Sequence, residues 1–151
     1  MRPACLVVNP VYQNNNIFDA KSPLNRDDCL VFFRQLQSQL RVLGFDLQTQ
    51  DRHPVAGSEL VIYNDMPRVC PPLEYASKSH LLIFESQLIR AKNWSRRRHR
   101  AFKTILTWND DWVDNKKYFK FNFSFQIPSK INSYSFTRPK LAGAIVGAHV
   151  T

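Results

Sequence analysis

The stretch ACLVVN at residues 4–9 decides the fold class of this chain. It is a continuous apolar run with β-branched side chains that ends at Pro10, and such a run is typical of a strand buried on both faces of a sheet. Comparable short runs follow along the chain: FDLQT at 45–49, ELVIY at 59–63, HLLIF at 80–84 and KTILTW at 103–108. Short buried strands separated by a helix and by loops predict an α/β fold with a parallel sheet.

One helix is the most clearly marked element of the sequence. Asn25 can cap its N-terminus, with Asp27 and Asp28 in the first turn. Apolar residues then recur at helical spacing, and Gly44 is expected to end the helix. The recurring apolar residues are Leu30, Phe33, Leu36, Leu40 and Leu43.

Polar residues that follow the predicted strands are the candidate ligand-binding residues. In parallel sheets, ligands bind beyond the carboxyl ends of the strands. The residues at these ends are Asn9-Pro10, Asn64-Asp65, Glu85-Ser86 and Asn109-Asp110-Asp111. A polar loop at 13–23 is long enough to line such a site. Asp110, Asp111 and Asp114 lack a regular metal-ligand spacing, so helix capping is the expected role of this group.

Glu85 stands out among the carboxylates. It follows the strongly apolar run LLIF at 81–84, so it is expected at the ligand-binding edge of the sheet. Partial burial there would raise its pKa towards neutrality, which suits a general base. The pattern alone leaves open the alternative of a strand-end carboxylate satisfied by hydrogen bonds.

The composition describes one basic globular domain. The chain has 151 residues, 44% of them hydrophobic, and a net charge of +9, which excludes a disordered or low-complexity chain. No apolar run approaches the roughly 20 residues of a transmembrane helix and no secretory signal is recognisable, so a cytoplasmic protein is expected. Cys5, Cys29 and Cys70 have no metal-ligand spacing and are expected to be reduced and mostly buried.

The run RRRHR, from Arg96 to Arg100, is the sharpest charge feature. It would attract phosphates or an anionic membrane surface, which would give the protein a peripheral location at a membrane. The alternative is a solvated helix face.

A strand with alternating aromatic residues is predicted at 117–125 (KYFKFNFSF). Nucleic acid is a less favoured partner for it, because Lys120 lies opposite the four phenylalanines instead of beside them. The phenylalanines Phe119, Phe121, Phe123 and Phe125 are expected to face the core. Beyond this strand, we divide the chain into a domain at 1–128, a polar linker at 129–139 and an apolar segment at 140–151. The last segment is either the final strand of the sheet or the start of a truncated second domain.

Several segments together resemble the fucosyltransferases of glycosyltransferase family ten. These are Phe84-Glu85-Ser86 after an apolar strand, Trp94, the run FKTILTWNDD at 102–111 and the run DNKKYF at 114–119. Upstream, the helix ending in Leu43-Gly44-Phe45 and the run ELVIYNDMP at 59–67 are similar to bacterial and viral members. The resemblance covers nearly the whole chain and is most specific over residues 81–121.

The resemblance implies a three-layer Rossmann-like parallel sheet that forms one half of a GT-B glycosyltransferase, the half that binds the acceptor. The complete enzyme would transfer fucose from GDP-fucose to a glycan hydroxyl with inversion and without a catalytically required metal. The Glu of the Phe-Glu-Ser element is the family's proposed general base, which corresponds to Glu85 here. Acceptor contacts are then expected at strand ends and in adjoining loops, from Asn14, Asn64, Asp65, Ser86, Arg90, Trp94 and Asn109.

The sequence departs from this family in two respects. Gln87-Leu88-Ile89-Arg90 replaces the Pro- and Ser-containing segment of the animal members, which leaves the acceptor sugar open. Family members continue into a second domain that holds GDP-fucose, whereas this sequence stops at Thr151. The chain is therefore expected to bind no cofactor and to be inactive alone, and a donor-domain chain is a candidate partner. The alternative function is a non-enzymatic basic module that binds nucleic acid or an anionic membrane surface.

Overall fold

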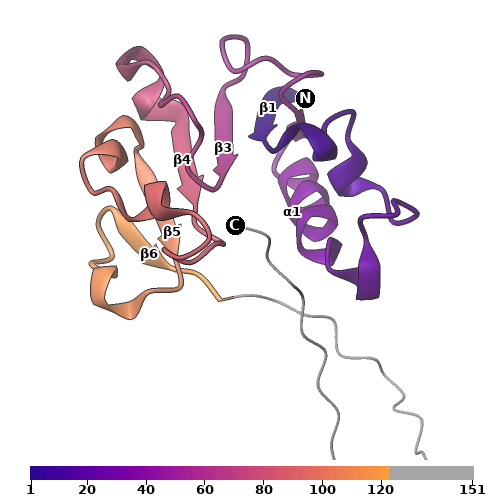
Figure 1. Cartoon of the computed structure of the whole chain (residues 1–151). Coiled ribbons are helices and arrows are strands. Elements are labelled where there is room, and N and C mark those ends of the chain that lie inside the picture. The colour runs from indigo at the N-terminus through magenta and orange to yellow at the C-terminus, as the bar shows by residue number, and fades with distance from the viewer. Residues whose placement is uncertain (123–151) are drawn as a thin grey trace, which may run out of the picture.

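A single parallel sheet of six strands organises the molecule (Figure 1). The structure is a computed structural model, and it describes residues 1–122. The strands are β1 (Arg2–Val7), β2 (Phe45–Thr49), β3 (Leu60–Asn64), β4 (Ser79–Leu82), β5 (Thr104–Thr107) and β6 (Tyr118–Lys120). They lie in the order β2-β1-β3-β4-β5-β6, and every neighbouring pair is parallel. The α/β, Rossmann-like parallel sheet expected from the sequence is confirmed.

The helix between β1 and β2 is α1 (Val31–Val42). It begins later than predicted, because Asp27 and Asp28 have φ values of 52° and 57° and cannot form a first helical turn. Asn25 still satisfies a backbone amide at the start of the helix, since its side-chain oxygen accepts a hydrogen bond of 2.9 Å from the Leu30 amide. The helix ends as predicted: Gly44, at φ 82°, donates its amide to the Arg41 carbonyl at 3.0 Å.

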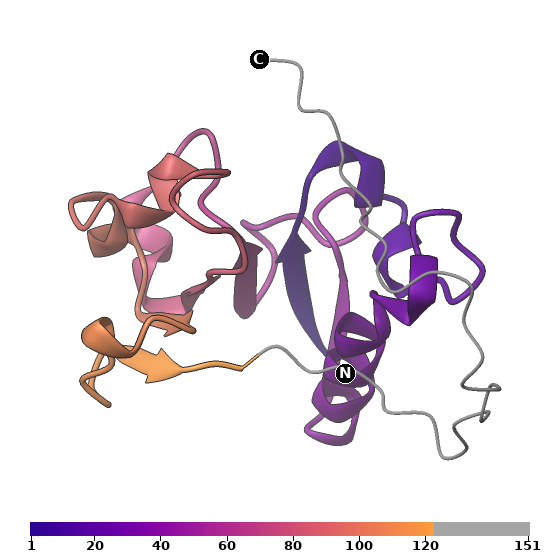
Figure 2. The ribbon, with the colours of Figure 1, turned by 60° about the horizontal axis from the view of Figure 1, so that its bottom comes forward.

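Within residues 1–122, α1 is the only α-helix, and the remaining helical turns are short 3₁₀ segments, three of them before α1 and four after β3. These are Pro10–Tyr12, Asn16–Phe18, Arg26–Asp28, Leu73–Lys78, Ala91–Trp94, Arg98–Ala101 and Asp110–Trp112. Figure 2 shows α1 at the β1 end of the sheet and β6 at the opposite end. The sheet is thus covered by one helix on one face and mainly by 3₁₀ turns and loops on the other.

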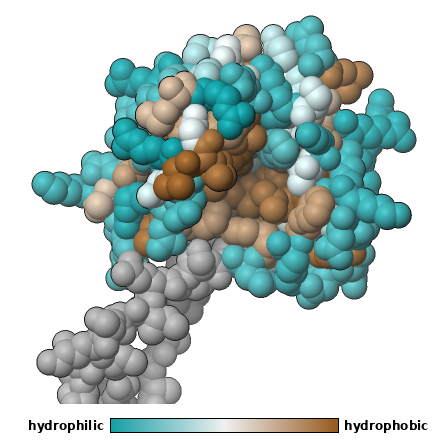
Figure 3. Space-filling model, turned by 180° about the vertical axis from the view of Figure 1, so that it is seen from behind, coloured by the Kyte–Doolittle hydropathy of each residue, from teal (hydrophilic) through white to brown (hydrophobic). Residues whose placement is uncertain are grey.

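Side chains that alternate along the strands build two hydrophobic layers, one on each face of the sheet. Ala4 and Leu6 of β1 pack with Phe33 of α1 on one face. Cys5 packs on the other face with Met66 and Phe102. Such burial on both faces explains why the strand sequences are continuous apolar runs. Viewed from behind, the surface has a hollow in which hydrophobic side chains are surrounded by hydrophilic ones (Figure 3).

The last strand corrects the expectation that its phenylalanines all face the core. In β6 the buried side chain is Tyr118, whereas Phe119 is 36% exposed. Phe121, directly after the strand, does pack against the layer that contains α1. Among the described residues, β6 has a neighbouring strand on one side only, which leaves Phe119 less covered. Phe123 and Phe125 lie outside the described residues, as do the predicted boundaries near 128 and 139 and the segment 140–151.

The cysteines are free thiols but are not mostly buried. Cys5 is buried, which raises the pKa of its thiol to about 12, while Cys70 is partly covered and Cys29 is exposed. The predicted majority of buried thiols is therefore wrong. In the part of the chain that the structure describes, no helix has the length and apolar character needed to cross a bilayer.

Candidate functional site at the carboxyl edge of the sheet

The strand order changes direction between β1 and β3, because β2 lies on the far side of β1. At such a point the connections leave in opposite directions and open a crevice beyond the carboxyl ends of the strands. A cavity of about 510 Å³ lies there. Its lining residues are Asn9, Tyr12, Ile17, Cys29, Leu30, Phe33, Asn64, Asp65, Phe84, Glu85, Ile89 and Arg90.

An aromatic cluster forms the apolar wall of this cavity. The rings of Phe33 and Phe84 stack with their centroids 5.5 Å apart. Phe32 lies edge-on to both of them, and its ring centroid is 5.3 Å from that of Phe121. The start of α1 is therefore packed against residues that follow β4 and β6. This packing holds the segment Phe84-Glu85 against the body of the domain.

Glu85 lines the cavity and has a perturbed carboxyl group. Burial raises the pKa of Glu85, and the nearby Asp65 carboxylate raises it further, while Arg90 acts in the opposite direction. A carboxylate with a raised pKa has a higher affinity for a proton than an ordinary carboxylate, which suits a general base. Glu85 can therefore accept a proton from a hydroxyl group bound in the cavity.

Asp65 holds the backbone that carries Glu85. Its Oδ1 accepts hydrogen bonds from the amides of Phe84 (2.8 Å) and Glu85 (3.0 Å) and from Nδ2 of Asn93 (2.7 Å). Asp65 adopts φ 63°, a left-handed conformation that is strained for most residues but tolerated by Asp. Because three donors bond to this one oxygen, the Asp65 side chain fixes the backbone that follows β4.

Asn93 is the residue that sequence reasoning missed. It is fully buried, its Oδ1 accepts from the Met66 amide at 2.7 Å, and its Nδ2 also donates to the Glu85 carbonyl at 3.0 Å. His99 continues the network, with Nε2 at 2.8 Å from the Asn93 carbonyl and Nδ1 at 3.1 Å from the Tyr118 hydroxyl. Asn93 stands one residue before Trp94 in a polar segment, so neither periodicity nor a motif marks it.

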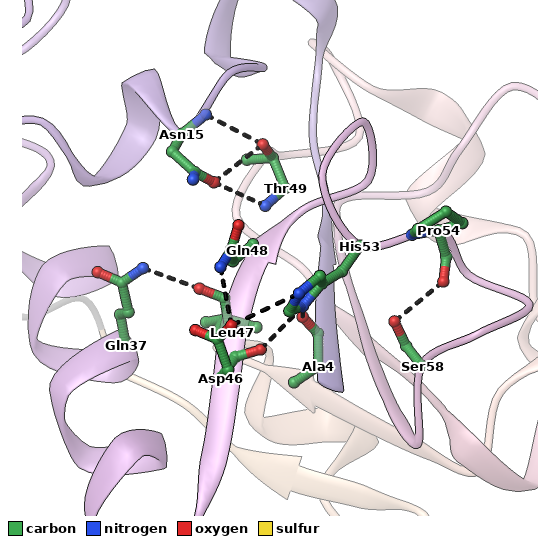
Figure 4. Close-up of polar contacts among 10 residues, drawn as sticks. All are labelled: Ala4, Asn15, Gln37, Asp46, Leu47, Gln48, Thr49, His53, Pro54 and Ser58. Carbon is green, nitrogen blue, oxygen red and sulfur yellow. Dashed lines mark hydrogen bonds and ion pairs between the residues drawn. The ribbon is translucent and has the colours of Figure 1, made fainter. Parts of the chain in front are cut away.

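The loop that follows β1 is fixed to the end of β2. The side-chain oxygen of Asn15 accepts from the Thr49 amide at 2.9 Å and from the Thr49 hydroxyl at 3.1 Å (Figure 4). Gln50 bonds both the amide and the carbonyl of Val8 through its side chain. These contacts allow Tyr12 and Ile17 to line the cavity, as expected for a long loop. Asn14 is exposed, and its amide bonds Asp51 at 3.0 Å away from the cavity.

Three further predicted acceptor residues lie outside the cavity. Trp94 packs between Trp108 and Trp112, with ring centroids 5.7 and 5.3 Å away, on the face of the sheet opposite α1. Asn109 caps the turn Asp110–Trp112, because its Oδ1 accepts from the Asp111 amide at 3.1 Å. The Ser86 carbonyl accepts a hydrogen bond of 2.9 Å from the Arg90 amide, and Ser86 does not line the cavity.

The predicted residues that the structure brings together are Asn64, Asp65, Glu85 and Arg90. The side-chain oxygen of Asn64 is buried and has no hydrogen-bond partner among the described residues. An unpaired buried acceptor costs free energy, and such groups are concentrated at functional sites. The four residues combine a base, a cation and amide groups at one edge of the sheet.

The acidic group after β5 does not cap a helix as expected: Asn109 caps the short segment Asp110–Trp112, Asp110 pairs with Lys120, and Asp114 closes the turn before β6. Asp114 accepts hydrogen bonds from the amides of Lys116, Lys117 and Tyr118 at 2.8 to 2.9 Å, which lowers its pKa to about 2. Within residues 1–122, no group of three or more His, Cys, Asp or Glu side chains is arranged to hold a metal ion.

Some side chains of the arginine run 96–100 pack against the domain, and others are exposed to solvent. The guanidinium of Arg96 lies over the rings of Trp112 and Tyr118, and Arg98 donates to the Arg68 carbonyl at 3.4 Å. Arg97 and Arg100 are exposed beside a hollow separate from the Glu85 cavity. Only part of the run is therefore available to an anionic surface.

No family model, curated protein or solved structure matches this chain.

Proposed function

We propose that this chain is the acceptor-binding half of an inverting fucosyltransferase with Glu85 as general base. The observation that carries the proposal is the position of Glu85 in the 510 Å³ cavity, with a pKa raised by burial and by Asp65. The resemblance of Phe84-Glu85-Ser86 and the following segments to glycosyltransferase family ten gives the reaction class.

The cavity offers complementary surfaces for a sugar acceptor. The aromatic wall made by Phe33 and Phe84 suits the apolar face of a sugar ring, and Asn64 at the cavity edge offers an amide to its hydroxyl groups. Glu85 accepts the proton of the reacting acceptor hydroxyl while the oxygen of that hydroxyl attacks the anomeric carbon of fucose. Attack from the face opposite the departing nucleotide inverts that carbon.

The donor GDP-fucose is held by a nucleotide-binding half in this proposal. Transfer requires both reactants at near-attack distance, so the acceptor half contributes the base and the acceptor orientation. The exposed mouth of the cavity at the carboxyl edge of the sheet is the surface that the donor half faces.

The test compares fucosyl transfer by this chain joined to the donor half of a related fucosyltransferase with transfer by the same fusion carrying Glu85→Gln. Loss of a general base is expected to lower kcat by about 10²- to 10⁴-fold with little change in acceptor binding. Glu74→Gln, which makes the same chemical change at an exposed site far along the chain, is expected to leave the rate unchanged. Equal rates for Glu85→Gln and the parent fusion would exclude Glu85 as the base.

A further inference from the structure

Three cationic side chains line cavities that neighbour the Glu85 cavity. A second cavity, of about 420 Å³, shares Asn64, Asp65 and Arg90 with the first and adds Arg68. A third, of about 310 Å³, is lined by Arg68, Arg90 and Lys92. Arg90 lines all three cavities, so they lie next to one another around its side chain. The Glu85 cavity is therefore adjacent to a cationic pocket.

The cations of this pocket form no ion pair among the described residues. The ion pairs there are Arg34–Asp28, Arg52–Asp51, His53–Asp46 and Lys120–Asp110, so none involves Arg68, Arg90 or Lys92. Oδ1 of Asp65 is occupied by three hydrogen-bond donors, and Glu85 acts on Arg90 electrostatically. Two carboxylates beside three cations leave the pocket with an excess of positive charge.

We infer that Arg68 and Arg90, with Lys92 beside them, bind an oxyanion carried by the molecule that occupies the Glu85 cavity. Guanidinium groups bind phosphate, sulfate and carboxylate with paired hydrogen bonds, and such charge-assisted bonds are stronger than neutral ones. Among residues 1–122, the contact from Arg98 reaches the backbone carbonyl of Arg68, and no ion pair engages the Arg68 side chain. The open pocket also admits a group that remains partly in water.

The inference rests on the proposed function only for the source of the anion. In a fucosyltransferase the oxyanion comes either from an acidic sugar of the acceptor or from the diphosphate of the nucleotide donor. Both place negative charge beside the reacting hydroxyl. Arg90 already acts electrostatically on Glu85, so an anion at Arg90 is close enough to influence the base.

The experiment measures binding of three probes to the full chain by calorimetry at about 0.15 M salt, where diffuse attraction is screened. The probes are inorganic pyrophosphate, lactose, and lactose that carries a sialic acid. Tighter binding of the sialylated sugar than of lactose identifies an acidic acceptor, whereas binding of pyrophosphate alone identifies the donor diphosphate. Either result supports the oxyanion pocket.

Matched variants separate this pocket from the general basic character of the protein. The double variant Arg68→Gln/Arg90→Gln is expected to bind the anionic probe about 10- to 100-fold more weakly than the parent does. Arg97→Gln with Arg100→Gln removes the same charge at another surface and is expected to change affinity by less than about twofold. Circular dichroism and urea unfolding of both double variants check that the fold is retained.

Two outcomes would overturn the inference. Equal losses in the two double variants would mean that anions are attracted by overall charge, and no binding of either anionic probe would mean that the pocket is not an anion site. If lactose binds all variants equally, its acidic form gains nothing and pyrophosphate does not bind, the oxyanion pocket is excluded while the proposed acceptor-binding function stands.

Discussion

Asn93 donates a hydrogen bond of 2.7 Å to Asp65 in the interior of the domain, across 28 residues of sequence. The same Asn93 side chain accepts from the Met66 amide and donates to the Glu85 carbonyl. One buried amide thus joins the ends of β3 and β4 to the segment that follows them. The position of the Glu85 backbone therefore depends on hydrogen bonds from residues outside its own strand.

Removing the Asn93 amide should destabilise the protein strongly. Asn93→Ala leaves the Met66 amide without an acceptor and takes one of three donors from Asp65, so we expect a loss of about 3 kcal/mol in the free energy of unfolding. Urea unfolding followed by circular dichroism measures it. Asn16→Ala, at an exposed position, should stay within about 0.5 kcal/mol. A similarly small change for Asn93→Ala would contradict the bracing role.

The charge of Asp65 should be visible in the titration of Glu85. Asp65→Asn keeps an oxygen to accept the three hydrogen bonds and removes the negative charge, so the pKa of Glu85 should fall. Because the chain has three glutamates, at 59, 74 and 85, carbon-13 NMR of their carboxyl groups can follow each one. Glu59 and Glu74 serve as internal references. An unchanged or higher pKa of Glu85 would show that Asp65 does not act on it through charge.

Glu85 should lower stability at neutral pH. Its pKa is raised in the folded state, so the folded protein holds the proton more tightly than the unfolded chain, and stability falls as pH rises through the folded-state pKa. Glu85→Gln should therefore be more stable than the parent at pH 7, and the difference should shrink towards pH 4. Thermal unfolding at the two pH values measures this, with Glu74→Gln as the control. A difference that grows on acidification is the contrary result.

His99 should make the protein sensitive to mild acid. Burial lowers the pKa of His99, so the unfolded chain binds a proton at higher pH than the folded protein does. Stability is therefore present above a pH of about 6.5 and lost as pH falls towards the lower folded-state pKa. His99→Gln should lose less stability than the parent between pH 7.5 and 5.5. Parallel losses in the two proteins would mean that His99 is not the responsible group.

The aromatic wall should contribute more stability than the exposed end of the helix. Phe33 is 5% exposed and stacks on Phe84, so Phe33→Ala should cost about 3 to 5 kcal/mol through lost burial and a new cavity. Leu43, at 65% exposure, should tolerate Ala within about 0.5 kcal/mol. Denaturant unfolding of both variants compares them. Equal losses in the free energy of unfolding for the two variants would show that the burial of Phe33 does not decide its contribution to stability.

The sequence by itself determined the class of fold and the edge at which to look. Continuous apolar runs predict strands buried on both faces, because in such strands each side chain meets a hydrophobic layer whichever way it points. The same local reasoning placed Asn64, Asp65 and Glu85 after strand ends and Gly44 at the end of the helix. These features depend on a few neighbouring residues, which a pattern can read.

Only the tertiary structure decided which of the polar residues meet. Asn14 is held at the end of β2, Trp94 packs on the far face, and Asn93 reaches Asp65 through a turn with no regular periodicity. The direction of a loop side chain follows from which distant groups satisfy its hydrogen bonds, and those partners are set by chain packing. Local periodicity holds no information about them.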